Sequence, residues 1–194
     1  MPKKFIYKIN NQNAFSCILN STQCTATSNT SGNRCKRKCI IGFEYCPIHL
    51  LYLKHLKIKD SLIPNSGKGL FVCNKSVGPN DIVFRKDDVI CDYKGETINN
   101  AIRQQRYNGK NAPYAIELSN NNIIDCACKR GIGSLINTSP GHNNASFSIN
   151  NQQHTVRIKA TKNIRNNTEI YLSYGSSYRF NDGSTHITKN YYPS

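Results

Sequence analysis

The sequence predicts a mainly β domain with little helix, preceded by a small cysteine-rich module. After Asp60, short runs rich in Val, Ile, Phe and Tyr alternate with turn formers, as in GKGLFVC, VICDYKG, YAIEL, TVRIKA and EIYLSYG. Five of the nine cysteines, by contrast, fall between residues 17 and 46. The length of 194 residues suits one domain with a small appendage.

Charge is concentrated at the N-terminal end. Lys and Arg outnumber Asp and Glu by 26 to 11, a net charge of +15, and residues 1–60 hold ten basic but only two acidic residues. Such a surface attracts polyanions through counterion release, so contact with DNA or a nucleosome through this basic module is one expectation. The alternative is a solvated basic surface that only keeps the protein in solution.

Neither a membrane span nor a secretory signal is expected. No stretch approaches the roughly 18 consecutive apolar residues that a spanning helix needs. The first fifteen residues contain two early lysines without an apolar run after them. Nine cysteines in this context predict reduced thiols or a bound metal, not a disulfide framework, and an intracellular location.

The cysteine-rich module has the spacing of a zinc site. Ten residues separate each neighbouring pair of three cysteines and two residues separate the last from a histidine; the four are Cys24, Cys35, Cys46 and His49. Thiolates and imidazole are preferred ligands of tetrahedral zinc, and four protein ligands indicate a structural ion. Cys17 or Cys39 could replace one of them, and free cysteines in an unstructured tail are the alternative.

This polar segment cannot bury enough apolar surface to order itself, so metal binding would have to supply the folding free energy. The run CTATSNTSGNRCKRKCIIGFEYCPIH also resembles a small zinc motif of viral and cellular proteins, with a Thr-Ser-Gly-basic-Cys centre and a Cys-x-x-His end.

Two helices are expected. Apolar residues at helical spacing in IHLLYLKHLKI predict one helix over 48–58, a linker between modules, and Glu96–Tyr107 reads as the other. The chain is divided accordingly into a basic zinc module (1–50), a helical linker (51–60), a β domain (61–180) and a C-terminal tail (181–194).

Taken in order, the motifs GKGLF, CDYKGE, YAIEL, LINTS, NNASF and EIYLSYG resemble the SET domain of protein-lysine methyltransferases. The resemblance runs from about Leu62 to Tyr178. Compact viral members end in a similar Ser-Tyr-Gly and lack accessory cysteine domains. The resemblance implies short curved sheets and a pseudoknot, in which the closing strand forms a loop around the Asn137 segment.

The resemblance also implies the site. S-adenosylmethionine would be held by the Gly-x-Gly turn, by the Asn-x-Ser segment and by stacking aromatics, that is by Lys68, Gly69, Leu70, Asn137, Thr138, Tyr178 and Phe180. Methyl transfer requires a neutral lysine amine aligned with a sulfonium methyl. The hydroxyl of Tyr174 would orient that amine, Tyr114 would form a wall of the lysine channel, and Tyr171 and Leu172 would line it.

The sequence departs from the family pattern in ways that bear on function. Thr138 replaces the histidine of the family's Asn-His-Ser motif, which keeps open an inactive SET-like protein acting as a zinc-dependent nucleic-acid or protein-binding module. Leu172, where the family has Phe or Tyr, favours di- or trimethylation; the alternative is that Tyr171 fills this space after a register shift of one residue. The implied substrate is a histone or another lysine-bearing protein, the implied location is the nucleus (the host nucleus if the protein is viral), and a homodimer is a further expectation.

Overall fold

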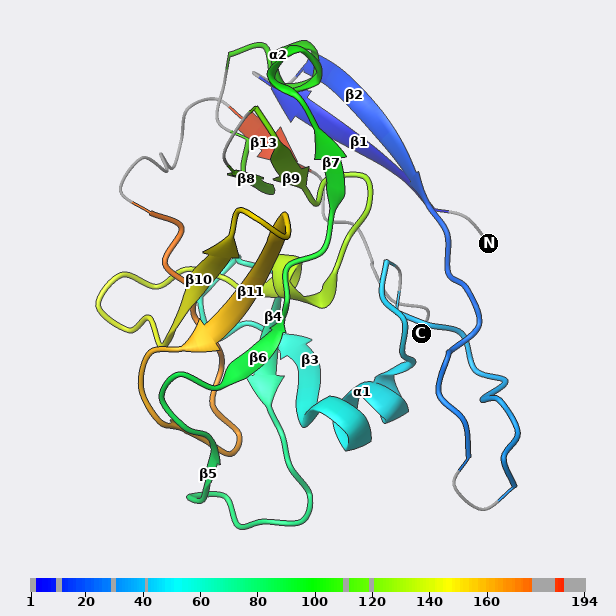
Figure 1. The fold of residues 1–194 in the computed structure, drawn as a ribbon, viewed down its shortest axis with the longest axis vertical. Coiled ribbons are helices and arrows are strands. Elements are labelled where there is room, and N and C mark those ends of the chain that lie inside the picture. The colour runs from blue at the N-terminus through cyan, green and yellow to red at the C-terminus, as the bar shows by residue number, and fades with distance from the viewer. Residues whose placement is uncertain are drawn as a thin grey trace.

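The computed structural model describes residues 3–9, 12–28, 31–40, 42–109, 112–118, 121–175 and 184–186 (Figure 1). The regular elements among these residues are mostly short strands, which confirms the mainly β class. The strands are β1 Lys3–Ile9, β2 Gln12–Leu19, β3 Leu56–Asp60, β4 Lys68–Val72, β5 Ile82–Phe84, β6 Val89–Asp92, β7 Glu96–Ile98, β8 Ala115–Glu117, β9 Ile123–Asp125, β10 Ala145–Asn150, β11 Thr155–Ala160, β12 Ile164–Arg165 and β13 Ser184–His186. The helices are α1 Pro47–Lys54, α2 Asn100–Tyr107 and the 3-10 turn η1 Ile132–Leu135.

The described strands form several small antiparallel sheets instead of one large sheet. Their orders are β13-β1-β2, β10-β11-β6, β12-β5, β3-β4 and β7-β9-β8. Because each sheet is only two or three strands wide, apolar faces must be covered by neighbouring sheets and loops. The main core extends from Ile40 and Leu50 through Leu70 and Ile158 to Leu172, and two small clusters lie apart from it around Cys17 and Cys24.

The N-terminal hairpin β1–β2 lies beside α2, and β13 pairs with β1, so both ends of the described chain meet in one sheet (Figure 1). The ring of Phe15 packs edge-on against Tyr107 of α2, with 5.3 Å between ring centroids. A disulfide joins Cys17 of β2 to Cys128, which follows β9. The expectation of reduced or metal-bound thiols therefore does not hold for these two cysteines.

The linker helix is shorter than predicted. Pro47 occupies the first turn of α1, and the helix ends at Lys54, where His55 caps it in a left-handed conformation with φ 54°. Residues 56–60 are not helical, because LKIKD pairs as strand β3 with β4, from Leu56 opposite Val72 to Asp60 opposite Lys68.

The second predicted helix also starts later than expected. Residues 96–98 form strand β7 and pair with β9. The side chain of Asn99 accepts a hydrogen bond from the Ile102 amide and so begins α2 as an N-cap. The helix is eight residues long and ends at Tyr107. In the part of the chain that the structure describes, no helix is long and apolar enough to cross a bilayer.

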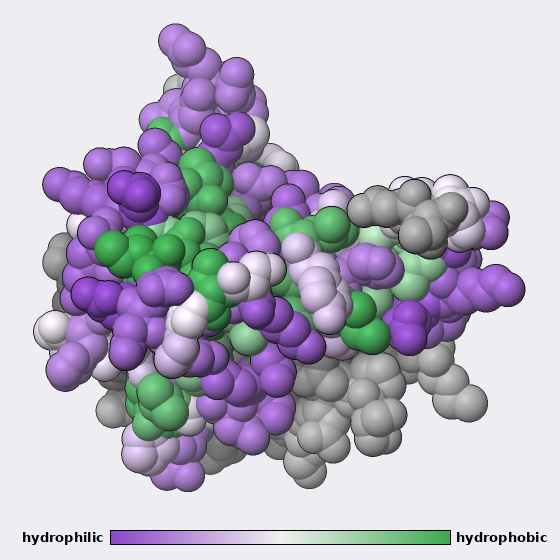
Figure 2. Space-filling view, turned by 90° about the horizontal axis from the view of Figure 1, so that it is seen from below, coloured by the Kyte–Doolittle hydropathy of each residue, from purple (hydrophilic) through white to green (hydrophobic). Residues whose placement is uncertain are grey.

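The lower face of the molecule is mostly hydrophilic, with hydrophobic side chains gathered in patches between the polar ones (Figure 2). Large apolar residues with at least two fifths of their surface exposed include Tyr52 and Leu53 of α1 and Val89 of β6. A cavity of about 270 Å³ lies between α1 and β6, with Leu53, Phe84, Val89 and Cys91 in its lining.

Candidate active site and metal centre

The segment 168–172 interlocks three parts of the chain that are far apart in sequence. On one side it lies along β4, where the Ile170 amide donates to the Leu70 carbonyl at 2.8 Å. Further along the segment, the Leu172 amide donates to the Asn137 carbonyl, and the Ala145 amide donates to the Tyr171 carbonyl. This crossing of segments is the pseudoknot that the family resemblance implies.

Asn144 holds this crossing in place. Its side chain is buried, donates to the Glu169 carbonyl at 2.9 Å and accepts from the Tyr171 amide at 2.9 Å. The Asn144 side chain therefore supplies the hydrogen-bond partners of two backbone groups that flank residue 170, the Glu169 carbonyl and the Tyr171 amide. Backbone groups that would otherwise be buried without partners are satisfied in this way.

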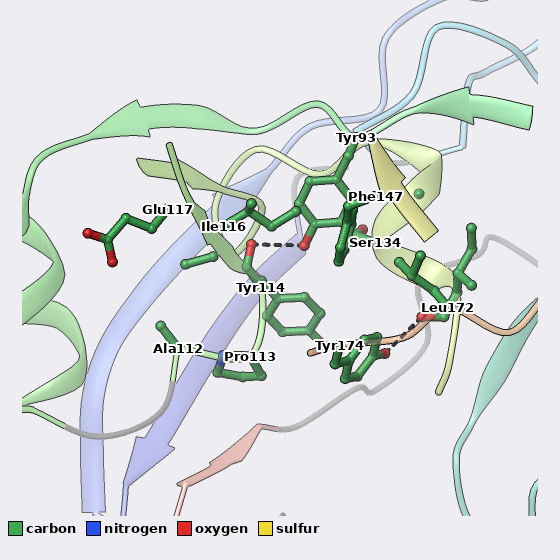
Figure 3. A pocket seen from close by; sticks show the side chains of 13 residues that line it. Tyr93, Ala112, Pro113, Tyr114, Ile116, Glu117, Ser134, Phe147, Leu172 and Tyr174 are labelled. Atoms are coloured by element: carbon green, nitrogen blue, oxygen red, sulfur yellow. Dashed lines mark hydrogen bonds between the residues drawn. The ribbon is translucent and has the colours of Figure 1, made fainter. Parts of the chain in front are cut away.

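A pocket of about 300 Å³ opens beside the crossing and is walled largely by aromatic and aliphatic side chains (Figure 3). Its lining includes Tyr93, Tyr114, Ile116, Phe147, Leu172 and Tyr174. The Tyr174 hydroxyl donates to the carbonyl of Ile136 at 2.8 Å, and the Tyr93 hydroxyl donates to the carbonyl of Tyr114 at 2.9 Å. Two hydroxyls are thus fixed in this wall, which also contains the polar side chains of Glu117 and Ser134.

Burial raises the pKa of a tyrosine in this wall and of a cysteine behind it. Removal from water raises the pKa of the Tyr93 hydroxyl well above its ordinary value. It likewise raises the pKa of the Cys126 thiol to about 12. The guanidinium of Arg130 lies 4.2 Å from the centre of the Tyr114 ring, and the Cys126 amide donates to the Tyr114 carbonyl. The turn after β9 therefore holds Tyr114 in place from behind.

The predicted residues of the closing segment separate onto two sides. Tyr174 and the fully buried Leu172 line the pocket. Tyr171 is not among the described residues that line it, since its hydroxyl donates instead to the Glu169 carboxylate at 2.9 Å. That hydrogen bond and, above all, burial raise the pKa of Tyr171 to about 12. Alternate residues of an extended segment point to opposite faces, which explains the separation.

The residues predicted to hold the cofactor meet at the start of β4. The Asn137 side-chain amide donates to the Lys68 carbonyl at 3.1 Å. Gly69 and Leu70 are buried, and Thr138 follows Asn137 directly in a half-buried position. Tyr178 and Phe180 lie outside the described residues. Asn137 and Tyr174 are neighbours, because the tyrosine hydroxyl bonds to the residue just before the asparagine.

The two glycines of GKGLF are each required by the backbone, for different structural reasons. Gly67 has a φ of +68°, a left-handed conformation that side chains disfavour. Gly69 has no room for a side chain, because a Cβ there would overlap the carboxylate of Glu169.

Sequence reasoning missed three residues of this region. Tyr93 and Phe147 line the pocket and pack edge-on, with 5.2 Å between ring centroids. Glu169 is 1% exposed and touches both Gly69 and Asn137. A lone acid within the apolar run of the closing segment was the available signal, since an acidic residue is rarely buried without partners.

The four predicted metal ligands come together in the N-terminal module. One ligand atom from each of Cys24, Cys35, Cys46 and His49 lies within 4.8 Å of all the others. His49 Nδ1 is 3.4 Å from the Cys24 sulfur and 3.3 Å from the Cys46 sulfur. Three thiolates and one imidazole fit a closed tetrahedral zinc site.

The two alternative ligands are engaged elsewhere. Cys39 is buried, and its thiol donates to the Glu44 carbonyl at 3.1 Å. Cys17 is bonded to Cys128. The module is otherwise ordered by isolated backbone bridges, Gln23 with Lys38 and Thr27 with Arg34.

Comparisons with known proteins agree with this geometry. Residues 82–175 match the family model of the SET domain. No curated relative matches the chain. Among solved structures, the polycomb repressive complex 2 of Chaetomium thermophilum in an autoinhibited conformation, bound to S-adenosylmethionine, is 21% identical with a TM-score of 0.51, and covers 64% of this chain. In the structure of the same complex with H3K27me3 and H3K27M, the sequence identity is 21%, the TM-score is 0.52 and the match covers 67% of this chain.

The match spans only 16% of the length of those relatives. At this identity the likeness concerns the fold alone.

Proposed function

We propose that this chain, whose residues 82–175 form a SET domain, transfers methyl groups from S-adenosylmethionine to lysine side chains of histones. One observation carries the proposal. The Tyr174 hydroxyl is fixed at the wall of an aromatic pocket by the carbonyl of Ile136, the residue next to Asn137. The Tyr174 hydroxyl and the Asn137 amide, which would bind the cofactor, are thereby held close together in space.

The cofactor would be held by the turn Lys68–Leu70 and by Asn137, with Thr138 in a supporting role. S-adenosylmethionine supplies a methyl group on a positively charged sulfur. The Asn137 amide is held against this turn by its hydrogen bond to the Lys68 carbonyl, so the turn and the amide would contact such a ligand together. The complex that resembles this chain also binds S-adenosylmethionine, which supports the assignment.

The pocket would receive the lysine. A volume of about 300 Å³ with walls formed by Tyr114, Phe147 and Leu172 accommodates an extended aliphatic chain. Such walls exclude water from the amine, and desolvation lowers the pKa of a lysine toward its neutral, nucleophilic form. The Tyr174 hydroxyl and nearby carbonyls would orient the amine for displacement.

The size of the wall residue favours more than one methyl per lysine. Leu172 has no hydroxyl that could retain water or restrict rotation of a methylated amine, and it is the residue of the closing segment that lines the pocket beside Tyr174. Di- or trimethylated product is therefore expected, and mass spectrometry of a lysine peptide after prolonged turnover checks it.

A histone substrate would satisfy the charge at the pocket. Glu117 is the acidic residue among the described pocket-lining residues, so it would favour a basic side chain beside the target lysine. The basic N-terminal module would add contacts to nucleosomal DNA, and the nucleus would be the site of action. If raising the salt concentration leaves nucleosome affinity unchanged, the DNA contact is wrong.

The zinc ion would have a structural role, because three thiolates and an imidazole leave no open coordination position. A homodimer stays a prediction, and sedimentation of the zinc-loaded protein tests it. The exposed apolar residues of α1 and β6 form one surface on which the two copies would meet.

Calorimetry and a transfer assay test the proposal together. The zinc-loaded chain is expected to bind S-adenosylmethionine and to methylate core histones. If it binds the cofactor but methylates no histone, peptide or intact protein, the inactive binding module becomes the better account.

A further inference from the structure

Glu169 is a buried acid whose carboxylate is surrounded by hydrogen-bond donors. Its side chain is 1% exposed. One oxygen accepts from the Ser61 hydroxyl at 2.7 Å. The other accepts from the Leu62 amide at 2.7 Å and from the Tyr171 hydroxyl at 2.9 Å. An ionised carboxylate offers only acceptors, so it matches this set of neutral donors.

The same carboxylate also touches the residues assigned to the cofactor. The Asn137 amide nitrogen is 3.5 Å from the Glu169 oxygen that Ser61 binds, and the same nitrogen donates to the Lys68 carbonyl. Gly69 lies directly against the carboxylate, which occupies the space that a side chain would need. Glu169 therefore links the loop before β4, the β4 turn and the Asn137 segment.

We infer that Glu169 is a positioning residue that fixes the position of the Lys68–Leu70 turn and the orientation of the Asn137 amide for cofactor binding. The inference rests on the proposed function for the identity of the ligand. Its physical basis is that three donors bind a single rigid acceptor, so the loop at Ser61 and Leu62 and the closing segment cannot shift independently. The turn that packs on the acceptor through Gly69 is fixed with them.

Glu169→Gln tests this role, because glutamine keeps the shape and replaces one acceptor oxygen by a donor. At least one of the three donors then loses its partner. We expect the affinities for S-adenosylmethionine and for its demethylated product S-adenosylhomocysteine to fall in parallel, by roughly 10- to 100-fold. In the cofactor-free protein, amide hydrogen exchange should accelerate over residues 61–70 and at 137, but not in β10 and β11.

Asn166→Ala is the matched control. Asn166 is also buried, and its side chain hydrogen-bonds to Asn74, Val77 and Gly78, away from the β4 turn. The Asn166→Ala substitution should lower the melting temperature and change the affinity for the cofactor by no more than about twofold. If both variants weaken the cofactor equally, Glu169 acts only through general stability and the inference is overturned.

Milder variants keep the test available if Glu169→Gln fails to fold. Ser61→Ala and Tyr171→Phe each remove one donor and retain the charge, and each should weaken both ligands by about 2- to 10-fold. Unchanged affinity in both variants overturns the inference. A loss confined to S-adenosylmethionine in Glu169→Gln also overturns it, since a charge effect on the sulfonium would then replace positioning.

The proposed function fails separately. If the wild-type chain binds neither ligand, the cofactor assignment is rejected, and hydrogen exchange in the cofactor-free variants still decides whether Glu169 fixes the turn.

Discussion

The N-terminal module and the β domain are ordered by different forces. In the compact cluster of the module, three of the four buried side chains are cysteines, with Ala26 as the fourth. The β domain instead buries a continuous set of aliphatic and aromatic residues from Leu56 to Leu172. Among the described buried residues of the module, only Ile40 and Leu50 join that core. The difference predicts that the polar part of the module depends on metal–ligand bonds, whereas the β domain depends on apolar burial.

Metal removal is expected to have the largest effect, because it should unfold one region and leave the other intact. A chelator or Cys46→Ser is expected to unfold residues 21–46 while β10 and β11 keep their protection, since structural zinc supplies about 10 kcal/mol or more of folding free energy in small modules. Hydrogen exchange and zinc analysis measure both effects.

Cys39→Ser is the control for metal removal. Cys39 is as buried as Cys46 but donates to Glu44 instead of joining the ligand cluster. It should retain one zinc ion per chain. Loss of zinc from this variant, with zinc retained in Cys46→Ser, would contradict the assigned ligand set.

Asp125→Asn should be the most damaging single change in the polar interior of the β domain. Asp125 is fully buried and accepts from Arg106 at 2.8 Å, from the Tyr107 hydroxyl and from the Ala127 amide. Breaking such a buried pair costs about 3 to 5 kcal/mol of unfolding free energy, measurable by urea denaturation.

Asp60→Asn provides the matched comparison for that ion pair. The pair of Asp60 with Lys68 is exposed, with 84% and 40% of the two side chains accessible, so its loss should cost roughly 0 to 1 kcal/mol. Equal costs for the two aspartate variants would mean that burial does not distinguish the pairs.

Leu172→Ala should destabilise the apolar core by about 2 to 4 kcal/mol, because Leu172 is 1% exposed and its truncation leaves a cavity beside the pocket. Zinc content should not change. Leu62, which is 71% exposed, gives the control variant Leu62→Ala, for which thermal unfolding should be nearly unaltered. A similar loss in both variants would show that the core boundary is misplaced.

The smallest effect is expected from alkaline pH. The pKa of Tyr171 in the folded chain is about 12, above the value of about 10 for an unfolded chain. Its contribution to stability is therefore complete below pH 10 and is lost as the pH rises through 12. Denaturation at several pH values should show a steeper decline for the wild type than for Tyr171→Phe. Parallel declines would argue against the bond to Glu169.

Short runs rich in β-branched and aromatic residues were sufficient to predict the β class. The proximity of Asn137 and Tyr174 came only from the resemblance of the ordered motifs to the SET family, since no local pattern links the two segments. Helix ends were less accessible. His55 ends α1 in a left-handed conformation, and the alternation of LKIKD then favours a strand. The helical spacing of the preceding residues concealed this change of period.

Long-range pairings were beyond local patterns. The Cys17–Cys128 disulfide spans 111 residues, and nothing near either cysteine indicates its partner. Glu169 was missed for a similar reason, since its partners Ser61 and Leu62 lie more than 100 residues away. Spacing was sufficient to predict that Cys24, Cys35, Cys46 and His49 come together, because all four lie within 26 residues of one another.

The most direct test of the pocket assignment is single-turnover methyl transfer to a lysine peptide by the wild type, Tyr174→Phe and Tyr52→Phe. Tyr52 lies on the exposed side of α1 and serves as a control for the loss of a hydroxyl. We expect Tyr174→Phe to bind S-adenosylmethionine normally and to transfer the methyl group about 100-fold more slowly, with Tyr52→Phe unchanged. Equal rates in all three proteins would contradict a role for the Tyr174 hydroxyl in orienting the lysine amine.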